Sequence, residues 1–220
     1  VFLATTNVRL AFDSTRLYTY GFARHNVSEY SGIEKPELER VARAFVSYFN
    51  SRARDLNVTA VVTGEEVPLL QEREVLHMRD VKDLVRKVFR LQEVSAGFLL
   101  VFGLIGYAIK GKAFARTLGR GLIWGGGLTV ALVLALALGS TLDFEGLFVR
   151  FHLLGFSNDL WQLDPDVYIL TRLFPEGFWL DATLLVAGAT LVEALLLLGL
   201  GFLLRGRTIR EEAPETLLRV

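Results

Sequence analysis

The sequence predicts a mainly α, polytopic membrane protein that also carries a small α+β extracytoplasmic domain. Three observations lead to this fold class. The 220 residues are 52% hydrophobic, and much of this apolar content lies in three long runs. The first 93 residues instead mix helical and strand periodicity. Basic and acidic residues are separated along the chain, as expected of the two sides of a membrane.

Residues 1–93 are expected to form the extracytoplasmic domain. The segment "GIEKPELERVARAFVSYFN" predicts a helix, because Pro36 suits the first turn and apolar residues recur at helical spacing. The segment "NVTAVV", just before Gly64, predicts a short strand. A second helix is predicted from Gln71. Its apolar stripe passes through His77, and this helix leads into the membrane.

The transmembrane bundle is predicted over residues 94–204, with spans at about 94–109, 118–139 and 182–204. A span needs roughly 20 apolar residues to cross about 30 Å of hydrocarbon. The first run is short, but the helix before it supplies the missing turns. Glu193 lies near the middle of the last span, where an ionisable group is a functional hypothesis by default. The plainer interpretation is a protonated or paired carboxylate that holds helices together.

The positions of Lys and Arg predict the orientation. The tail, residues 205–220, begins with three arginines and is predicted to be cytoplasmic. Segment 140–181 carries seven acids and two basic residues, so it is predicted outside, with residues 1–93. Export of residues 1–93 normally needs an upstream signal or span, and we expect "VFLA" to end a fourth, N-terminal span. The loop between the first two spans is also predicted cytoplasmic, since it has no acid among Lys110, Lys112, Arg116 and Arg120.

Two histidines fall on the predicted outer side. An apolar stripe from Phe144 to Leu154 predicts an interfacial helix with His152 at its edge, followed by loops on the outer leaflet. His77 and His152 are either interfacial side chains that satisfy backbone groups or an acid–base pair above a lipid-facing pocket. Imidazole suits proton transfer at neutral pH because its free pKa is near 6.5. Asp80, three residues after His77, is placed to orient that ring.

Other chemistries have little support in the sequence. The chain has no cysteine, which excludes disulfides, thiolate metal sites and a cysteine nucleophile. Its net charge is zero, so no nucleic-acid partner is expected. A metal site from His77, Asp80, His152 and Asp159 is conceivable, but HxxD on a helix is a weak signal, and we predict neither a metal nor a cofactor. We find no Gly-rich phosphate loop, GxSxG or HExxH motif.

Four blocks carry a family resemblance: "FNSRARDLNVTAVV", "LLQEREVLHMRDVKDLVRKVF", "FHLLGFSNDLWQLDP" and "LFPEGFW". They resemble a family of bacterial four-span membrane proteins that includes the lipoprotein intramolecular transacylase, from about Tyr18 to Leu204. The resemblance implies a multi-pass protein of the bacterial cytoplasmic membrane whose active site faces the extracytoplasmic side. It implies a diacylglyceryl-modified lipoprotein as substrate, with membrane lipid around it. The family's two essential histidines correspond to His77 and His152.

The implied reaction moves the sn-2 acyl chain from glycerol to the α-amine of the substrate's N-terminal cysteine, which gives the lyso-form lipoprotein. An amine with a pKa of about 7.7–8.0 needs a base, and the departing glycerol alkoxide needs a proton. We assign His77 as the base, oriented by Asp80, and His152 as the acid, although the roles are exchangeable and a transient acyl-imidazole stays open. Candidate supporting residues, by position only, are Lys82, Arg150, Asn158 and Asp159.

Two alternatives remain at the level of the sequence. One is a non-catalytic membrane protein whose outer domain binds a partner. The other is a related enzyme, either a lipid-ester hydrolase or an acyltransferase that uses another amine. The oligomeric state does not follow from the sequence.

Overall fold

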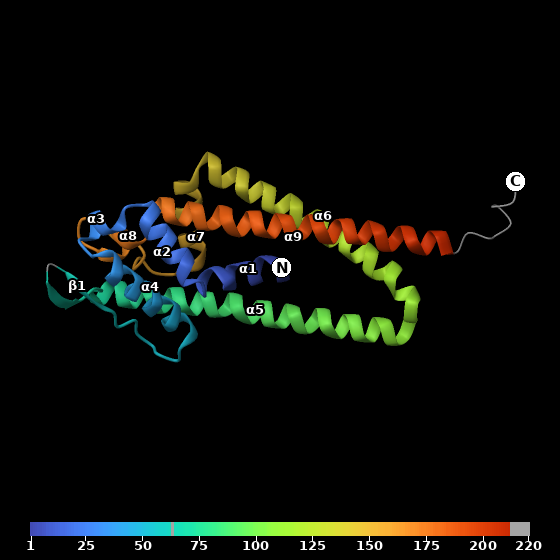
Figure 1. Ribbon diagram of the computed structural model, residues 1–220, viewed down its shortest axis with the longest axis horizontal. Helices are drawn as coiled ribbons and strands as arrows, with labels where there is room; N and C mark the ends of the chain where they lie inside the picture. Colours follow the sequence, from blue (N-terminus) through green and yellow to red (C-terminus); the bar gives the residue numbers. More distant parts are fainter. Residues whose placement is uncertain (63, 212–220) are drawn as a thin grey trace, which may run out of the picture.

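The computed structural model describes residues 1–62 and 64–211, and Figure 1 shows an elongated, mainly helical molecule. The predicted tail, 205–220, therefore lies largely outside the described residues. The elements in chain order are α1 (Phe2–Phe12), α2 (Thr15–Arg24), α3 (Val27–Ser31), α4 (Lys35–Asn50), β1 (Thr59–Val62), β2 (Glu65–Pro68), α5 (Glu72–Lys110), the 3-10 turn η1 (Gly111–Ala113), α6 (Phe114–Leu142), α7 (Phe144–Gly155), α8 (Ile169–Leu173) and α9 (Glu176–Glu211).

The domain predicted to lie outside the membrane, called the outer domain below, has a core of aromatic side chains from α2, α4 and the segment before α9. Phe45 of α4 is 1% exposed, and its ring centroid lies 5.0 Å from that of Phe174. The apolar stripe predicted for α4 faces this core, so the helix prediction is confirmed. The predicted strand is also confirmed as β1, which pairs antiparallel with β2 in the register Ala60↔Val67. The positive φ of Gly64, 91°, makes the turn between them possible.

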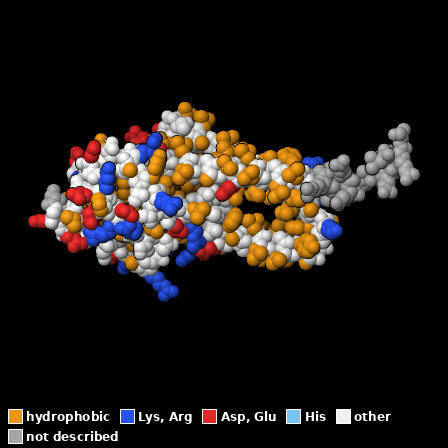
Figure 2. Space-filling model, in the orientation of Figure 1, with side chains coloured by type: hydrophobic (Ala, Val, Ile, Leu, Met, Phe, Trp, Pro, Cys, Tyr) orange, Lys and Arg blue, Asp and Glu red, His pale blue; other side chains and the backbone are white. Residues whose placement is uncertain are grey.

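Two helical stretches of the described chain are long and apolar enough to cross a membrane, Glu72–Leu142 and Glu176–Arg205. The first is not one span, because the chain reverses direction at η1 and α6 runs back beside α9 (Figure 1). Three long helices therefore coincide with the three predicted spans, whose bounds stay a prediction. Apolar side chains cover this part of the molecule, whereas charged side chains gather at the end that holds α3, α4 and β1 (Figure 2).

Helix α1 lies along α5 and α9 (Figure 1). The side-chain amide of Asn7 donates to Glu193 Oε2 at 2.8 Å and to Thr190 Oγ1 at 3.1 Å. This contact supports the plainer interpretation of Glu193, a paired carboxylate that joins helices. Helix α1 thus accompanies the predicted spans, although its residues were assigned to the domain at 1–93.

Candidate active site

Local sequence signals position both histidines. Helix α5 begins with a capping box, in which Gln71 and Glu74 each accept a hydrogen bond from the other's backbone N–H. This fixes the first turn of α5, and His77 follows within one turn. Helix α7 begins at Asp143, whose side chain accepts from Gly146 N at 2.9 Å. His152 lies in the last turn of α7.

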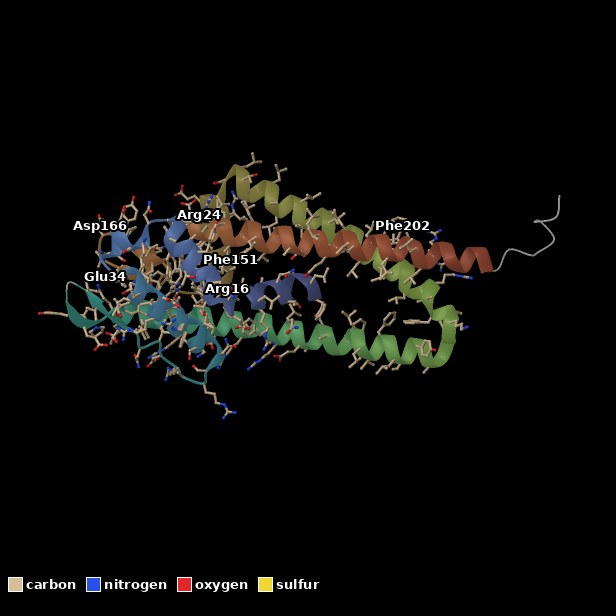
Figure 3. All side chains as sticks on the ribbon, viewed as in Figure 1. Arg16, Arg24, Glu34, Phe151, Asp166 and Phe202 are labelled. Carbon is tan, nitrogen blue, oxygen red and sulfur yellow. The ribbon has the colours of Figure 1, made fainter. Side chains whose placement is uncertain are left out.

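The two imidazoles lie side by side where α7 meets α5. Their ring centroids are 6.2 Å apart and their planes are inclined by 31°. Both side chains are buried, and each residue is only 7% exposed. Three aromatic rings pack on this pair, from Phe148 on α7 and from Phe156 and Trp161 in the segment after it. The ring of Phe151, labelled in Figure 3, lies 5.3 Å from that of His152.

One hydrogen bond orients the His152 ring. Its Nδ1 lies 2.7 Å from the backbone carbonyl oxygen of Phe148. A carbonyl oxygen only accepts, so Nδ1 carries a proton, and in the neutral ring Nε2 is left with a lone pair. Burial lowers the pKa of His152, and the bond to the Phe148 carbonyl partly opposes this by raising it. His152 is thus a neutral ring with a defined basic nitrogen.

The pKa of His77 is lowered from 6.5 to about 4, mainly by burial. Neighbouring His152 and Arg73 contribute to this lowering, and the Asp80 carboxylate opposes it. The Nδ1 atom of His77 is buried and has no hydrogen-bond partner in the described part of the chain. A bare acceptor costs less there than an unpaired N–H, which favours the tautomer with the proton on Nε2.

Two predicted supporting residues meet each other. The Asp80 carboxylate accepts from Asn158 Nδ2 at 2.8 Å, so its hydrogen bond runs to the segment after α7 and not to the His77 ring. Asp159, the next residue of this segment, is held by Arg73 of α5. The Arg73 guanidinium donates to the Asp159 backbone oxygen and lies 3.4 Å from its carboxylate. Both contacts join α5 to the same segment.

The other two predicted residues point elsewhere. Lys82 is 3% exposed, and its ammonium donates to the Ala53 carbonyl at 2.7 Å and lies over the ring of Tyr48. It is therefore held by the loop after α4. Arg150 is exposed on α7. Within the described residues no cluster of three or more His, Cys, Asp or Glu side chains is arranged to hold a metal ion.

The structure also identifies residues that the sequence analysis missed. Glu74 is fully buried and accepts from Leu170 N at 2.7 Å, which ties the start of α5 to the start of α8. The Q-x-x-E pattern at the start of α5 is a capping signal that could have revealed it. Trp161 was not among the predicted site residues, but its ring lies 5.0 Å from that of His152.

The protein has long apolar helices, a predicted outer domain at one end and a buried, neutral imidazole pair at their junction. These features define a membrane-integral protein with a site suited to acid–base chemistry. Comparison with known proteins gives the family. A family model described as lipoprotein intramolecular transacylase Lit matches residues 1–179. The chain belongs to this family, and it is an enzyme of the acyltransferase class.

Three similar proteins illustrate the relationship. An uncharacterized protein of Aquifex aeolicus (strain VF5) is 28% identical over 202 residues, which are 90% of this chain and 86% of that one. The structure of the membrane-integral transacylase Lit from Bacillus cereus superposes with a TM-score of 0.77 at 21% identity, covering 94% of this chain and 91% of that chain. A variant of it with a histidine replaced by arginine gives 0.71 at 20% identity, with 96% and 88% covered. At these identities the two structures show a shared fold.

Proposed function

We propose that the protein transfers the sn-2 acyl chain of a diacylglyceryl-modified lipoprotein to the α-amine of its N-terminal cysteine, producing the lyso form. The observation that carries this proposal is the buried pair His77 and His152, with ring centroids 6.2 Å apart at the junction of the outer domain and the apolar helices. The family supports a lipoprotein as the substrate class. The substrate contains both nucleophile and electrophile, so the enzyme needs to supply position and proton transfer.

Each histidine has a distinct role in this proposal. The free amine attacks the ester carbonyl carbon, so a C–N bond forms and the C–O bond to glycerol breaks. One proton must leave the nitrogen and reach the glycerol oxygen. His152 Nε2 takes and returns that proton, because its Nδ1 is committed to Phe148. The sequence favoured the opposite assignment but left the roles exchangeable.

His77 then acts as a neutral donor. A ring whose pKa is lowered to about 4 is uncharged at neutral pH, and its N–H can still donate to the carbonyl oxygen as negative charge develops there. This role needs the tautomer with the proton on Nε2, which the unpaired, buried Nδ1 favours. No serine or cysteine nucleophile takes part.

The spacing of the rings restricts how the ester binds. A group stacked between two ring faces needs about 7–8 Å, since van der Waals contact takes about 3.5–4.0 Å on each side. At 6.2 Å the faces are too close, so the ester lies across the ring edges. The acyl chains lie along the exposed apolar side of α7, where Phe151 is 53% and Leu154 90% exposed.

A mass measurement tests the proposal. A synthetic diacylglyceryl lipopeptide is incubated with the purified enzyme; transfer conserves the mass and blocks the amine, whereas hydrolysis releases a fatty acid. His152→Ala should slow transfer by about two to four orders of magnitude. The matched control is His25→Ala. Its Nε2 lies 3.0 Å from the Asp181 carboxylate and its ring is not among those that pack on the histidine pair, so the rate should stay within about twofold. Unchanged rates for both His77→Ala and His152→Ala would refute the mechanism, and fatty-acid release alone would indicate a hydrolase.

A further inference from the structure

Residues 156–168, which we call the strap, join α7 to α8 and cross α5 over the histidine pair. Two polar contacts beside the histidine pair fix the strap on α5, Asn158 to Asp80 and Arg73 to Asp159. A third, from Gln71 Nε2 at the start of α5 to the Val167 carbonyl at 3.1 Å, holds the far end of the strap. Positions 73, 77 and 80 are separated by four and three residues, so they share one face of the helix. The first two contacts therefore bracket His77 along α5.

The strap brings two aromatic rings onto the imidazoles. The Phe156 ring lies 5.3 Å from that of His77 and 5.5 Å from that of His152. The Trp161 ring lies 5.0 Å from that of His152. Since both histidines are 7% exposed, these rings separate the site from the aqueous side of the outer domain.

The side chain of Asn158 has a defined orientation. Its Oδ1 accepts from Leu160 N at 3.1 Å, which shapes the turn ahead of Trp161, and its Nδ2 donates to Asp80 at 2.8 Å. Each end of the amide therefore has its own partner. An aspartate at this position would keep the turn contact but would oppose the Asp80 carboxylate with a second negative charge.

We propose that the strap is a water shield that makes the site a transferase, with Asp80 and Asn158 as the positioning residues that hold it closed. This inference rests on the proposed function. A base that removes a proton from an attacking amine activates a water equally well. In hydrolysis the water oxygen bonds to the carbonyl carbon, the C–O bond to glycerol breaks and the glycerol oxygen receives a proton. The products are a fatty acid and a lipopeptide with a new glycerol hydroxyl, whose amine stays free. Only exclusion of water separates the two outcomes.

The test measures the ratio of fatty acid released to amine-blocked lipopeptide, in oxygen-18-labelled water. Unfolded enzyme makes neither product, so a purely structural defect lowers the rate but leaves this ratio unchanged. N158D should raise the ratio about tenfold, because loss of a charge-assisted hydrogen bond and repulsion from Asp80 open the strap. The label should appear in the fatty-acid carboxyl group. N57D makes the same change at an exposed position ahead of β1 and should keep the wild-type ratio.

A swap of the two side chains isolates the contact. The double variant D80N/N158D places the amide on α5 and the carboxylate on the strap, which restores the hydrogen bond in the opposite direction and should return the ratio to within about twofold of wild type. A second route, W161A, removes a shielding ring while leaving both polar contacts intact, and it should also raise the ratio. A wild-type ratio in both N158D and W161A would overturn the shield. A wild-type enzyme that forms no amine-blocked product would instead overturn the proposed function.

Discussion

His77 should stay uncharged when the pH falls from about 7 to about 5. Its pKa is lowered from 6.5 to about 4, mainly by burial and with contributions from the neighbouring His152 and Arg73. At about pH 5 a histidine with the ordinary pKa is only about 3% neutral, whereas one with a pKa of about 4 is about 90% neutral. The fraction of enzyme with a neutral imidazole at this position is therefore about 30-fold larger than for a solvated ring.

The same pKa change predicts how stability depends on pH. Between about pH 6.5 and 4 the unfolded chain binds a proton at His77 that the folded chain does not bind, so the folded state loses stability as the pH falls. Above about pH 6.5 the ring is neutral in both states and contributes nothing. From pH 7 to 5 the loss amounts to about 2 kcal/mol, since each pH unit below 6.5 adds about 1.36 kcal/mol.

Nuclear magnetic resonance with nitrogen-15-labelled histidine tests both statements. The chain has three histidines, and His25→Asn leaves the two rings of the site to be followed in detergent. We expect a midpoint of about 4 for His77. In parallel, thermal unfolding at pH 7 and 5 should show a smaller pH effect for His77→Gln, which cannot titrate. A midpoint near 6.5 in the folded enzyme, or an equal pH effect in His77→Gln, would show that burial does not control this ring.

Two further predictions concern helix packing, measured by thermal unfolding in one detergent. Asn7→Ala should cost about 1–3 kcal/mol, because it removes the donor to Glu193, and Asn7→Ala with Glu193→Leu should recover most of this loss, since no polar partner is then left behind. A double variant no more stable than the single one would contradict that explanation. Gly201→Ala should cost about 1–3 kcal/mol, since its Cβ would lie 2.8 Å from a backbone oxygen of α6. Gly199→Ala meets nothing within 4 Å and should be neutral or stabilising, so equal losses for both would refute close α6–α9 packing.

Local patterns predicted the elements but not their partners. The apolar runs identified the long helices, and the stripe through His77 identified the buried face of α5, because both depend only on residues near in sequence. Asp80 was assigned to His77 for the same reason, as the neighbour at i+3. In the structure its hydrogen bond goes to Asn158, 78 residues away, because the strap brings an amide donor to it. The helical periodicity of α5 gives no information about a distant segment that packs across this helix.

Lys82 is a second residue whose contacts could not be predicted from its neighbours in the sequence. It was a candidate supporting residue by position only, yet the residue is 3% exposed and is held by the loop after α4, away from the histidine pair. Glu74 was missed although its capping signal was readable, because a cap alone does not predict the second contact, to Leu170 on α8. The histidine pair was within reach of sequence reasoning because the predicted topology places both residues on one side of the membrane.

In the reaction that we propose, the low basicity of the buried rings constrains the order of the chemical steps. An ammonium with a pKa of about 7.7–8.0 does not give its proton readily to imidazoles whose pKa values lie lower. The reactive substrate is therefore the minor free amine. Once its nitrogen has bonded to the carbonyl carbon it carries a positive charge and becomes far more acidic, and only then does His152 remove the proton. Under this proposal the buried pair is matched to the tetrahedral intermediate and not to the resting substrate, and the same burial would keep water from taking the amine's place.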